Sequence, residues 1–174
     1  MTDASPLDLL FGAVIVRSAH VIRPDRHLGL ELGDQSGILD PELTEPLAAA
    51  VRKRLPGGVA GIAVGNGVVE ILLGYLVARE HGIPLASITN VEGRIEVGGR
   101  FPASGLVFLV TTILEQESTL AEFEAACARA NCVPAGAVAL VDRLAGPDSR
   151  VSALLRWVDH EYVPSACPRC RAEA

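Results

Sequence analysis

The stretch VFLVTTILEQEST, residues 107–119, joins a run of apolar residues to a polar, acidic segment. A short continuous apolar run is typical of a strand buried on both faces, so we expect a strand over residues 106–110. A loop over 111–118 and a helix over 119–130 would follow. Proteins often bind phosphate where a loop enters the N-terminus of a helix. Two glutamates in this loop are therefore unexpected, because glycine and threonine suit a phosphate better.

Two helices carry recognisable start signals. Thr119 and Glu122 have the spacing of a capping box for the helix over 119–130. In DPELTEPLAAAVRKRL, residues 40–55, Asp40 is the expected N-cap, the next residue is proline, and basic residues fill the last turn.

Further elements alternate along the chain. Apolar runs predict strands, and a longer apolar segment that ends at a glycine predicts a buried helix. The expected strands are 59–64, 83–89 and 136–143, and the expected helix is 68–82. The sequence of residues 90–105 predicts a small antiparallel segment that turns at Glu92–Gly93 or Gly98–Gly99.

This order predicts an α/β fold: a mostly parallel sheet with helices on both faces. We expect one domain over residues 1–174, with a C-terminal tail over 145–174. Ligands bind beyond the carboxyl ends of the strands in such sheets. The loops at 65–67 and 111–118 are therefore the places to look for a site.

Composition excludes some functions. Apolar residues make up 49% of the 174 residues, so a sizeable core is expected. The formal charge is −6, and the 15 basic residues are scattered, which argues against nucleic-acid binding. No apolar run approaches the ~18 residues of a membrane span, and the first residues lack the pattern of a signal peptide. We expect a cytoplasmic protein.

The ordered set of segments resembles the type I phosphoribosyltransferases, and most closely their orotate phosphoribosyltransferase branch. The similarity covers roughly residues 7–145 and rests on FGAV, DPEL, GIAVGNG, HGIPL, VFLVTTILEQEST and ALVDR in this order; the C-terminal CPRC is similar to a tail of some orotate-type members. The resemblance implies a homodimer, a small hood built from the N-terminal segment and residues 87–104, and Mg²⁺ with phosphoribosyl pyrophosphate (PRPP) if the chain is active.

The resemblance also places the functional residues. Thr111 and Thr112 stand where the family has an acidic pair that binds the ribose hydroxyls, so we take them as candidate catalytic positions. The family's Thr- and Gly-rich phosphate loop is replaced by Glu115, Gln116 and Glu117, followed by Ser118 and Thr119. A carboxylate ~4 Å from a phosphate is repelled by about 1 kcal/mol in water and about 4 kcal/mol at an effective dielectric constant of 20. Carboxylates at a helix start that point to solvent are instead favourable.

Other ligand-contacting segments differ as well. Thr89 and Asn90 stand where the family has Arg-Lys, and only His27 keeps a match in the base-contacting stretch. Gly65-Asn66-Gly67, at the pyrophosphate loop, keeps its glycines and can present backbone amides to an anion. We therefore list His27, Thr89, Gly65, Asn66 and Gly67 as candidate ligand-binding residues.

Three functions remain open. The first is an orotate phosphoribosyltransferase-like protein with weak or lost PRPP transfer that still binds a nucleotide or phosphorylated ligand, or a partner. The second is an active phosphoribosyltransferase that converts orotate or another base with PRPP to a nucleoside monophosphate and pyrophosphate. The third is a non-catalytic structural or interaction dimer.

Two smaller features have more than one interpretation. Cys167 and Cys170 form a C-x-x-C pair, which is half of a zinc site, a reversible disulfide or an inert tail. Cys127 and Cys132 could supply further ligands, although a buried helical cysteine is usually an apolar core residue. Glu70, a lone charge in an apolar helix, could face the ligand cleft or solvent.

Overall fold

The computed structural model describes residues 16–22, 27–32, 39–144, 150–156 and 161–162, together with Ser165, Cys167 and Cys170. In chain order the elements are β1 (Val16–Ile22), β2 (His27–Leu32), α2 (Pro41–Arg52), β3 (Val59–Val64), α3 (Val68–His81), β4 (Leu85–Val91), β5 (Arg94–Gly99), β6 (Leu106–Leu114), α4 (Glu117–Arg129), β7 (Val133–Asp142), β8 (Val151–Arg156) and β9 (Glu161–Tyr162). In this part of the chain, no helix is both long and apolar enough to cross a membrane.

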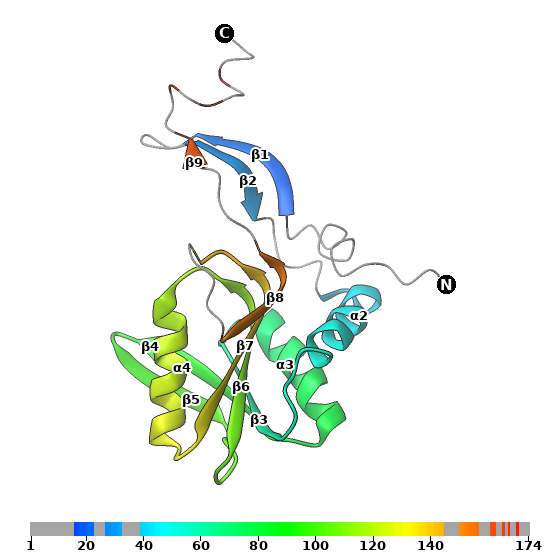
Figure 1. Cartoon of the computed structure of the whole chain (residues 1–174), viewed down its shortest axis with the longest axis vertical. Helices are drawn as coiled ribbons and strands as arrows, with labels where there is room; N and C mark the ends of the chain where they lie inside the picture. Colours follow the sequence, from blue (N-terminus) through cyan, green and yellow to red (C-terminus); the bar gives the residue numbers. More distant parts are fainter. Residues whose placement is uncertain are drawn as a thin grey trace.

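Six strands form the main sheet, in the order β5-β4-β3-β6-β7-β8 (Figure 1). All neighbours are parallel except β4 and β5, which form an antiparallel hairpin. The mostly parallel sheet predicted from the sequence is confirmed. Its centre is β3 and β6, which run in parallel register with Val64, the last residue of β3, opposite Val110 of β6.

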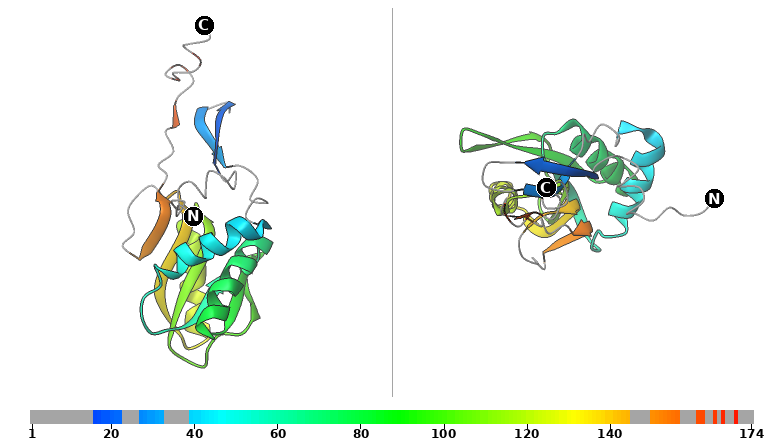
Figure 2. Two further views of the ribbon diagram at one scale, coloured as in Figure 1. Left: turned by 90° about the vertical axis from the view of Figure 1, so that its right-hand side faces the viewer. Right: turned by 90° about the horizontal axis from the view of Figure 1, so that it is seen from above.

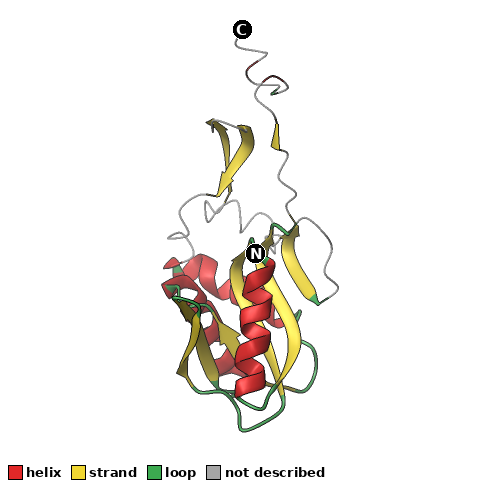
Figure 3. Cartoon of the chain, turned by 90° about the vertical axis from the view of Figure 1, so that its left-hand side faces the viewer, coloured by secondary structure: helices red, strands yellow, loops and turns green. Residues whose placement is uncertain are grey.

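Helices cover both faces of this sheet, as expected. Figure 2 (left) shows α2 and α3 in front of one face, and Figure 3 shows α4 in front of the other. Alternate residues of β6 point to opposite faces. Phe108 and Val110 join the core under α2 and α3, whereas Val107 and Leu109 join the core under α4. Burial on both faces explains why β6 is apolar at every position from Val107 to Val110.

The helix ends follow the predicted signals at two places. The side chain of Asp40 caps α2 by accepting a hydrogen bond from the backbone N–H of Glu42 at 3.0 Å, and proline is the first helical residue. The helix α3 ends at Gly82, which has a left-handed φ of +63°. Glycine adopts this conformation without the steric penalty of a Cβ.

The segment after Val110 differs from the prediction. Residues 111–114 continue β6 as a strand instead of opening a loop, and they pair with β7 as far as Asp142. Threonine and isoleucine favour strands because their branched side chains pack well on a pleated sheet. The prediction treated Thr111 as a loop residue because it is polar, but its side chain is buried.

The predicted capping box of Thr119 and Glu122 is also wrong. The helix α4 begins two residues earlier, at Glu117, with Gln116 as its N-cap. Glu122 therefore lies within the helix, and its carboxylate accepts a hydrogen bond from Asn90 Nδ2 at 2.6 Å. This bond joins α4 to β4.

Residues 87–104 do not form a hood. The hairpin of β4 and β5 turns at Glu92–Gly93, one of the two predicted turns, and it extends the main sheet as its antiparallel edge. Both turn residues have positive φ, 52° and 80°. The N-terminal strands β1 and β2 pair instead with β9 in a separate three-stranded sheet (Figure 1). At the other edge, residues 151–156, expected within the C-terminal tail, form β8 parallel to β7.

Gly74 sets how closely α3 approaches β3. A Cβ at this position would overlap Cγ1 of Val64. Overpacking costs about 1–3 kcal/mol, which exceeds the ~1 kcal/mol that alanine gains in helix propensity. We expect Gly74→Ala to lower the free energy of unfolding, measured by urea denaturation. Val64→Ala should then destabilise the Gly74→Ala protein less than it destabilises the wild type; strictly additive losses would contradict this packing.

Candidate functional site

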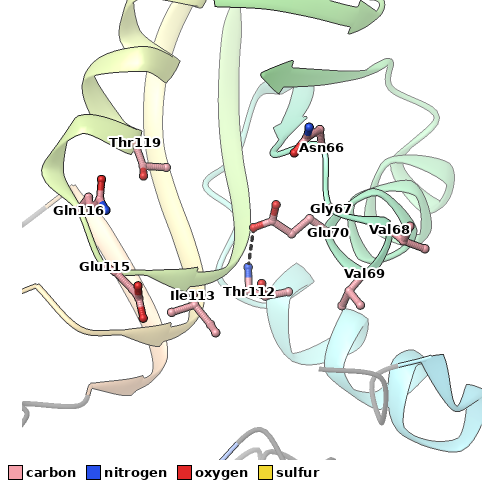
Figure 4. A pocket seen from close by; sticks show the side chains of 10 residues that line it. All are labelled: Asn66, Gly67, Val68, Val69, Glu70, Thr112, Ile113, Glu115, Gln116 and Thr119. Atoms are coloured by element: carbon pink, nitrogen blue, oxygen red, sulfur yellow. Dashed lines mark hydrogen bonds between the residues drawn. The ribbon is translucent and has the colours of Figure 1, made fainter. Parts of the chain in front are cut away.

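A pocket of about 800 Å³ opens beyond the carboxyl ends of β3 and β6 (Figure 4). It lies between the β3–α3 connection and the β6–α4 connection, the two loops that the sequence selected. Its lining residues are Asn66, Gly67, Val68, Val69, Glu70, Thr112, Ile113, Glu115, Gln116 and Thr119. Parallel strands place these two connections at the same edge of the sheet.

Glu70 joins the two sides of the pocket. Its carboxylate oxygen Oε1 accepts a hydrogen bond from the Thr111 hydroxyl at 2.6 Å and another from the Thr112 backbone N–H at 3.1 Å. Figure 4 shows Glu70 reaching from the first turn of α3 to the end of β6. Of the two interpretations of Glu70, the one that faces the cleft is therefore confirmed.

The second carboxylate oxygen of Glu70 lies against the glycines of the β3–α3 loop. A Cβ placed on Gly65 would collide with Oε2, and one placed on Gly67 would lie 3.5 Å from it. A side chain at position 65 would therefore displace the carboxylate beside it. The loop that the resemblance assigns to pyrophosphate has an internal anion at its surface.

The two candidate catalytic threonines have different surroundings. Both are buried, with 3% exposure for Thr111 and 4% for Thr112. The Thr111 hydroxyl is held between Glu70 and the backbone carbonyl of Ile113, at 3.2 Å from the latter, and Thr111 does not line the pocket. Thr112 does line it. The structure thus brings only the second threonine to the pocket wall.

The Glu-Gln-Glu segment turns its side chains in different directions. Glu115 forms an ion pair with Arg143, which follows β7, while remaining at the pocket wall. Gln116 accepts a hydrogen bond from the Ser118 hydroxyl at 3.2 Å. Glu117 is exposed in the first turn of α4, and neither it nor Ser118 is among the lining residues. The carboxylate of Glu117 is thus favourably placed at the helix N-terminus.

Two helices begin at the pocket, and the N-terminus of a helix carries partial positive charge. The N-caps Gly67 and Gln116 make no side-chain capping bond. Acidic residues occupy both first turns, Glu70 in α3 and Glu117 in α4. Carboxylates of the chain itself therefore offset the field that would otherwise attract a phosphate.

The remaining candidates lie apart from this pocket. Thr89 is in β4, where it pairs with Glu96 of β5, and it is not among the lining residues. His27 begins β2, opposite Tyr162 of β9, and its side chain is outside the described part of the structure. Sequence reasoning listed neither Val68, Val69 nor Ile113 for the pocket. Apolar wall residues carry no distinguishing signal in a chain where half of the residues are apolar.

The cysteines do not assemble into a metal site within the described residues, where no group of three or more His, Cys, Asp or Glu could hold an ion. Cys127 and Cys132 are buried in the core beneath α4. Burial, with smaller effects from Cys132 and Glu124, raises the pKa of Cys127 to about 12. Metals bind the thiolate, so a thiol with this pKa is a poor ligand at neutral pH. Cys167 is buried and Cys170 is half-buried.

The hydrogen bond from Thr111 can be tested by its energetic coupling to Glu70. Thr111→Val keeps the shape of the side chain but removes the donor, and a hydrogen bond to a charged group contributes about 1.5–3 kcal/mol. We expect a loss of this size in urea denaturation. In a Glu70→Ala background the same substitution should cost almost nothing. Equal losses in the two backgrounds would exclude this bond as a stabilising contact.

The raised pKa of Cys127 predicts both low reactivity and a pH dependence. Iodoacetamide at pH 8 should label Cys127 in urea but not in the native protein, as read by peptide mass spectrometry. The unfolded chain releases the thiol proton near pH 9.0 whereas the native protein holds it to about pH 12. The native state then binds more protons, so the free energy of unfolding should fall as the pH rises above 9. The Cys127→Ser protein should lack the part of this fall in unfolding free energy that comes from the Cys127 thiol.

Comparison with known proteins gives structural relatives only. No protein-family model matches the sequence, and no curated protein matches it. Among solved structures, orotate phosphoribosyltransferase from Aeropyrum pernix superposes with a TM-score of 0.69 at 16% identity, over 85% of this chain and 91% of that one. UMP synthase from Leishmania donovani gives 0.67 at 16% identity over 88% of this chain, which spans only 37% of that protein.

An adenine-specific relative superposes almost as well. Adenine phosphoribosyltransferase from Leishmania donovani gives a TM-score of 0.63 at 15% identity, over 90% of this chain and 81% of that one. The mostly parallel sheet and the helices on both faces agree with the resemblance noted in the sequence. The chain has the fold of the type I phosphoribosyltransferases.

Proposed function

We propose that this chain binds a small nucleotide-type ligand in the pocket beyond β3 and β6, and that its transfer of phosphoribosyl groups from PRPP is weak or lost. The observation that supports this most strongly is the Glu70 carboxylate against the Gly65-Asn66-Gly67 loop. A pyrophosphate bound to this loop in the manner expected for the family would lie beside that carboxylate.

Coulomb repulsion gives the size of the loss in phosphate affinity that the Glu70 carboxylate would cause. Like charges ~4 Å apart repel by about 1 kcal/mol in water and by about 4 kcal/mol at an effective dielectric constant of 20. These energies correspond to a loss of affinity between about fivefold and about a thousandfold. Glu70 is held in place by Thr111 and Thr112, so it cannot turn away without breaking two hydrogen bonds.

The chemistry of the pocket also favours binding over transfer. Threonine cannot stabilise a developing positive charge at the ribose as a carboxylate can. The two carboxylates of the pocket are already engaged, Glu70 by Thr111 and Thr112 and Glu115 by Arg143. Mg²⁺ prefers carboxylate and phosphate oxygens. Because both carboxylates of the pocket already have partners, this donor set fits the metal poorly.

The volume of the pocket favours a ligand over a purely structural role. About 800 Å³ lies within the usual range of roughly 300–1,000 Å³ for small-molecule sites. Hydroxyl and amide groups of Asn66, Thr112, Gln116 and Thr119 line it beside apolar Val69 and Ile113, and can bind a hydroxyl-rich, uncharged part of a nucleotide. Stabilisation by a panel of nucleosides and nucleotides, measured as a rise in Tm, tests this proposal. No rise with any of them would favour an interaction dimer.

Glu70→Gln tests the role assigned to the carboxylate. Glutamine keeps the acceptor for Thr111 but removes the charge, so we expect this variant to bind PRPP with Mg²⁺ at least about fivefold more tightly than the wild type in calorimetric titration. Wild type should release no pyrophosphate when orotate or adenine is added with PRPP.

Glu92→Gln is the matched control, because it makes the same charge change on the distant β4–β5 turn and should leave PRPP affinity unchanged. Turnover by the wild type would establish an active phosphoribosyltransferase and refute the proposed loss. Equal PRPP affinity in Glu70→Gln and wild type would show that Glu70 does not control the loop.

A homodimer is a second part of the proposal, supported by one face of α3. Val68, Ile71 and Tyr75 are large apolar residues with 72%, 39% and 51% exposure. Their spacing of three and four residues places them on one side of the helix. Val68 also lines the pocket, so a second copy of the chain seated on this face would adjoin the ligand.

Ile71→Asp tests this dimer face. A charge in an apolar interface would be desolvated without a partner, so we expect the mass in solution to fall from twice 18.2 kDa to 18.2 kDa, measured by light scattering after gel filtration. Val97→Asp, at an exposed valine of β5 with 44% exposure, is the control and should leave the mass unchanged. A monomeric wild type, or a dimer that survives Ile71→Asp, would rule out this face.

A further inference from the structure

A second hollow, distinct from the ligand pocket, contains three arginines. It has a volume of about 460 Å³ and lies along β8, the edge strand of the main sheet, beside the residues that follow α2. We call it the arginine groove, and its lining residues are Arg54, Pro56, Phe108, Ala135, Ala137, Arg150, Val151, Ser152, Ala153 and Arg156. None of these described residues carries a carboxylate. The groove and the ligand pocket share no lining residue.

This concentration of positive charge is unusual for the chain. Acidic residues outnumber basic ones by 21 to 15, giving a net charge of −6. A groove with three arginines among its lining residues therefore differs in charge from the chain as a whole. Each guanidinium has N–H donors in a planar fork that matches the oxygens of phosphate.

The arginines are held in position by contacts with the fold. Nη1 of Arg54 donates to the backbone carbonyl of Ala50 at 2.9 Å, and Nη2 of Arg156 donates to that of Val151 at 3.0 Å. Arg150 pairs with Glu124 of α4. Such anchoring reduces the side-chain entropy that is lost when a ligand binds.

The charge balance identifies Arg54 as the critical residue. Arg156 lies 3.6 Å from a carboxylate oxygen of buried Asp142, and Arg150 pairs with Glu124, so each of these charges has an acidic partner nearby. Arg54 instead donates to a neutral carbonyl. A guanidinium has five N–H donors, and this bond uses one of them.

We propose that the arginine groove is a second binding site, for a small phosphorylated molecule that it holds through its phosphate oxygens. The volume suits a small molecule. Guanidinium forks would bind the phosphate, while the alanine and valine side chains of β7 and β8 and the hydroxyl of Ser152 would contact the body of the ligand. This site does not depend on the function proposed for the pocket at β3 and β6.

Inorganic pyrophosphate, without divalent metal, is the probe. We expect saturable one-site binding in calorimetric titration that weakens as the salt concentration rises. Arg54→Gln should weaken it roughly ten- to a hundredfold, because hydrogen bonds between charged groups contribute most of the affinity. Arg54→Lys keeps the charge but loses the fork, and should weaken binding less. Circular dichroism and Tm confirm that the variants are folded.

Arg94→Gln is the matched control. It removes one arginine that pairs with Glu96 on β5, at the opposite edge of the same sheet, so it makes the same change in net charge. Absence of saturable binding to wild type, or equal weakening in Arg94→Gln and Arg54→Gln, would overturn the proposal. So would pyrophosphate binding that Glu70→Gln strengthens and Arg54→Gln leaves unchanged, because the anion would then occupy the β3–α3 loop. If Arg54→Gln abolishes PRPP binding, the PRPP was bound in the groove. That result would not contradict the Glu70 proposal.

Discussion

The hydrogen bonds between Glu70 and the end of β6 are the interaction on which the candidate site depends. They connect the first turn of α3 to Thr111 and Thr112, and so join the two connections that form the pocket walls. A carboxylate that is half-buried between two loops needs such donors, because an unpaired buried charge is strongly unfavourable. Gly65 supplies the space for its second oxygen. Three features of the sequence, a glycine, a glutamate and a threonine, thus have one structural explanation.

The fold that this chain shares with its structural relatives does not by itself fix its activity. The mostly parallel sheet with helices on both faces is that of a phosphoribosyltransferase fold, and folds of this kind support many functions through changes in their loops. Here a carboxylate of the protein itself, that of Glu70, lies against the β3–α3 loop. An internal carboxylate is present at a far higher effective concentration than any free ligand, so a phosphate has to compete with it at the β3–α3 loop.

Arginine side chains are instead gathered at one edge of the sheet. The arginine groove lies along β8, whereas the acidic pocket lies beyond β3 and β6. Because the two sites share no lining residue, the two proposed ligands would bind without direct competition. The exposed apolar face of α3 is a third surface, and it begins at Val68 on the rim of the pocket.

The sequence by itself determined the sheet, its parallel order and the two connections that form the pocket, because buried strands and capped helices leave local patterns. Asp40, Gly82 and the apolar run of β6 are examples. It could not determine where β6 ends, since Thr111 is polar yet buried by a partner 41 residues earlier in the chain. Nor could it choose between the cleft and solvent for Glu70, or gather Arg54, Arg150 and Arg156 into one groove. Those outcomes depend on contacts between distant segments, and only the tertiary structure brings such segments together.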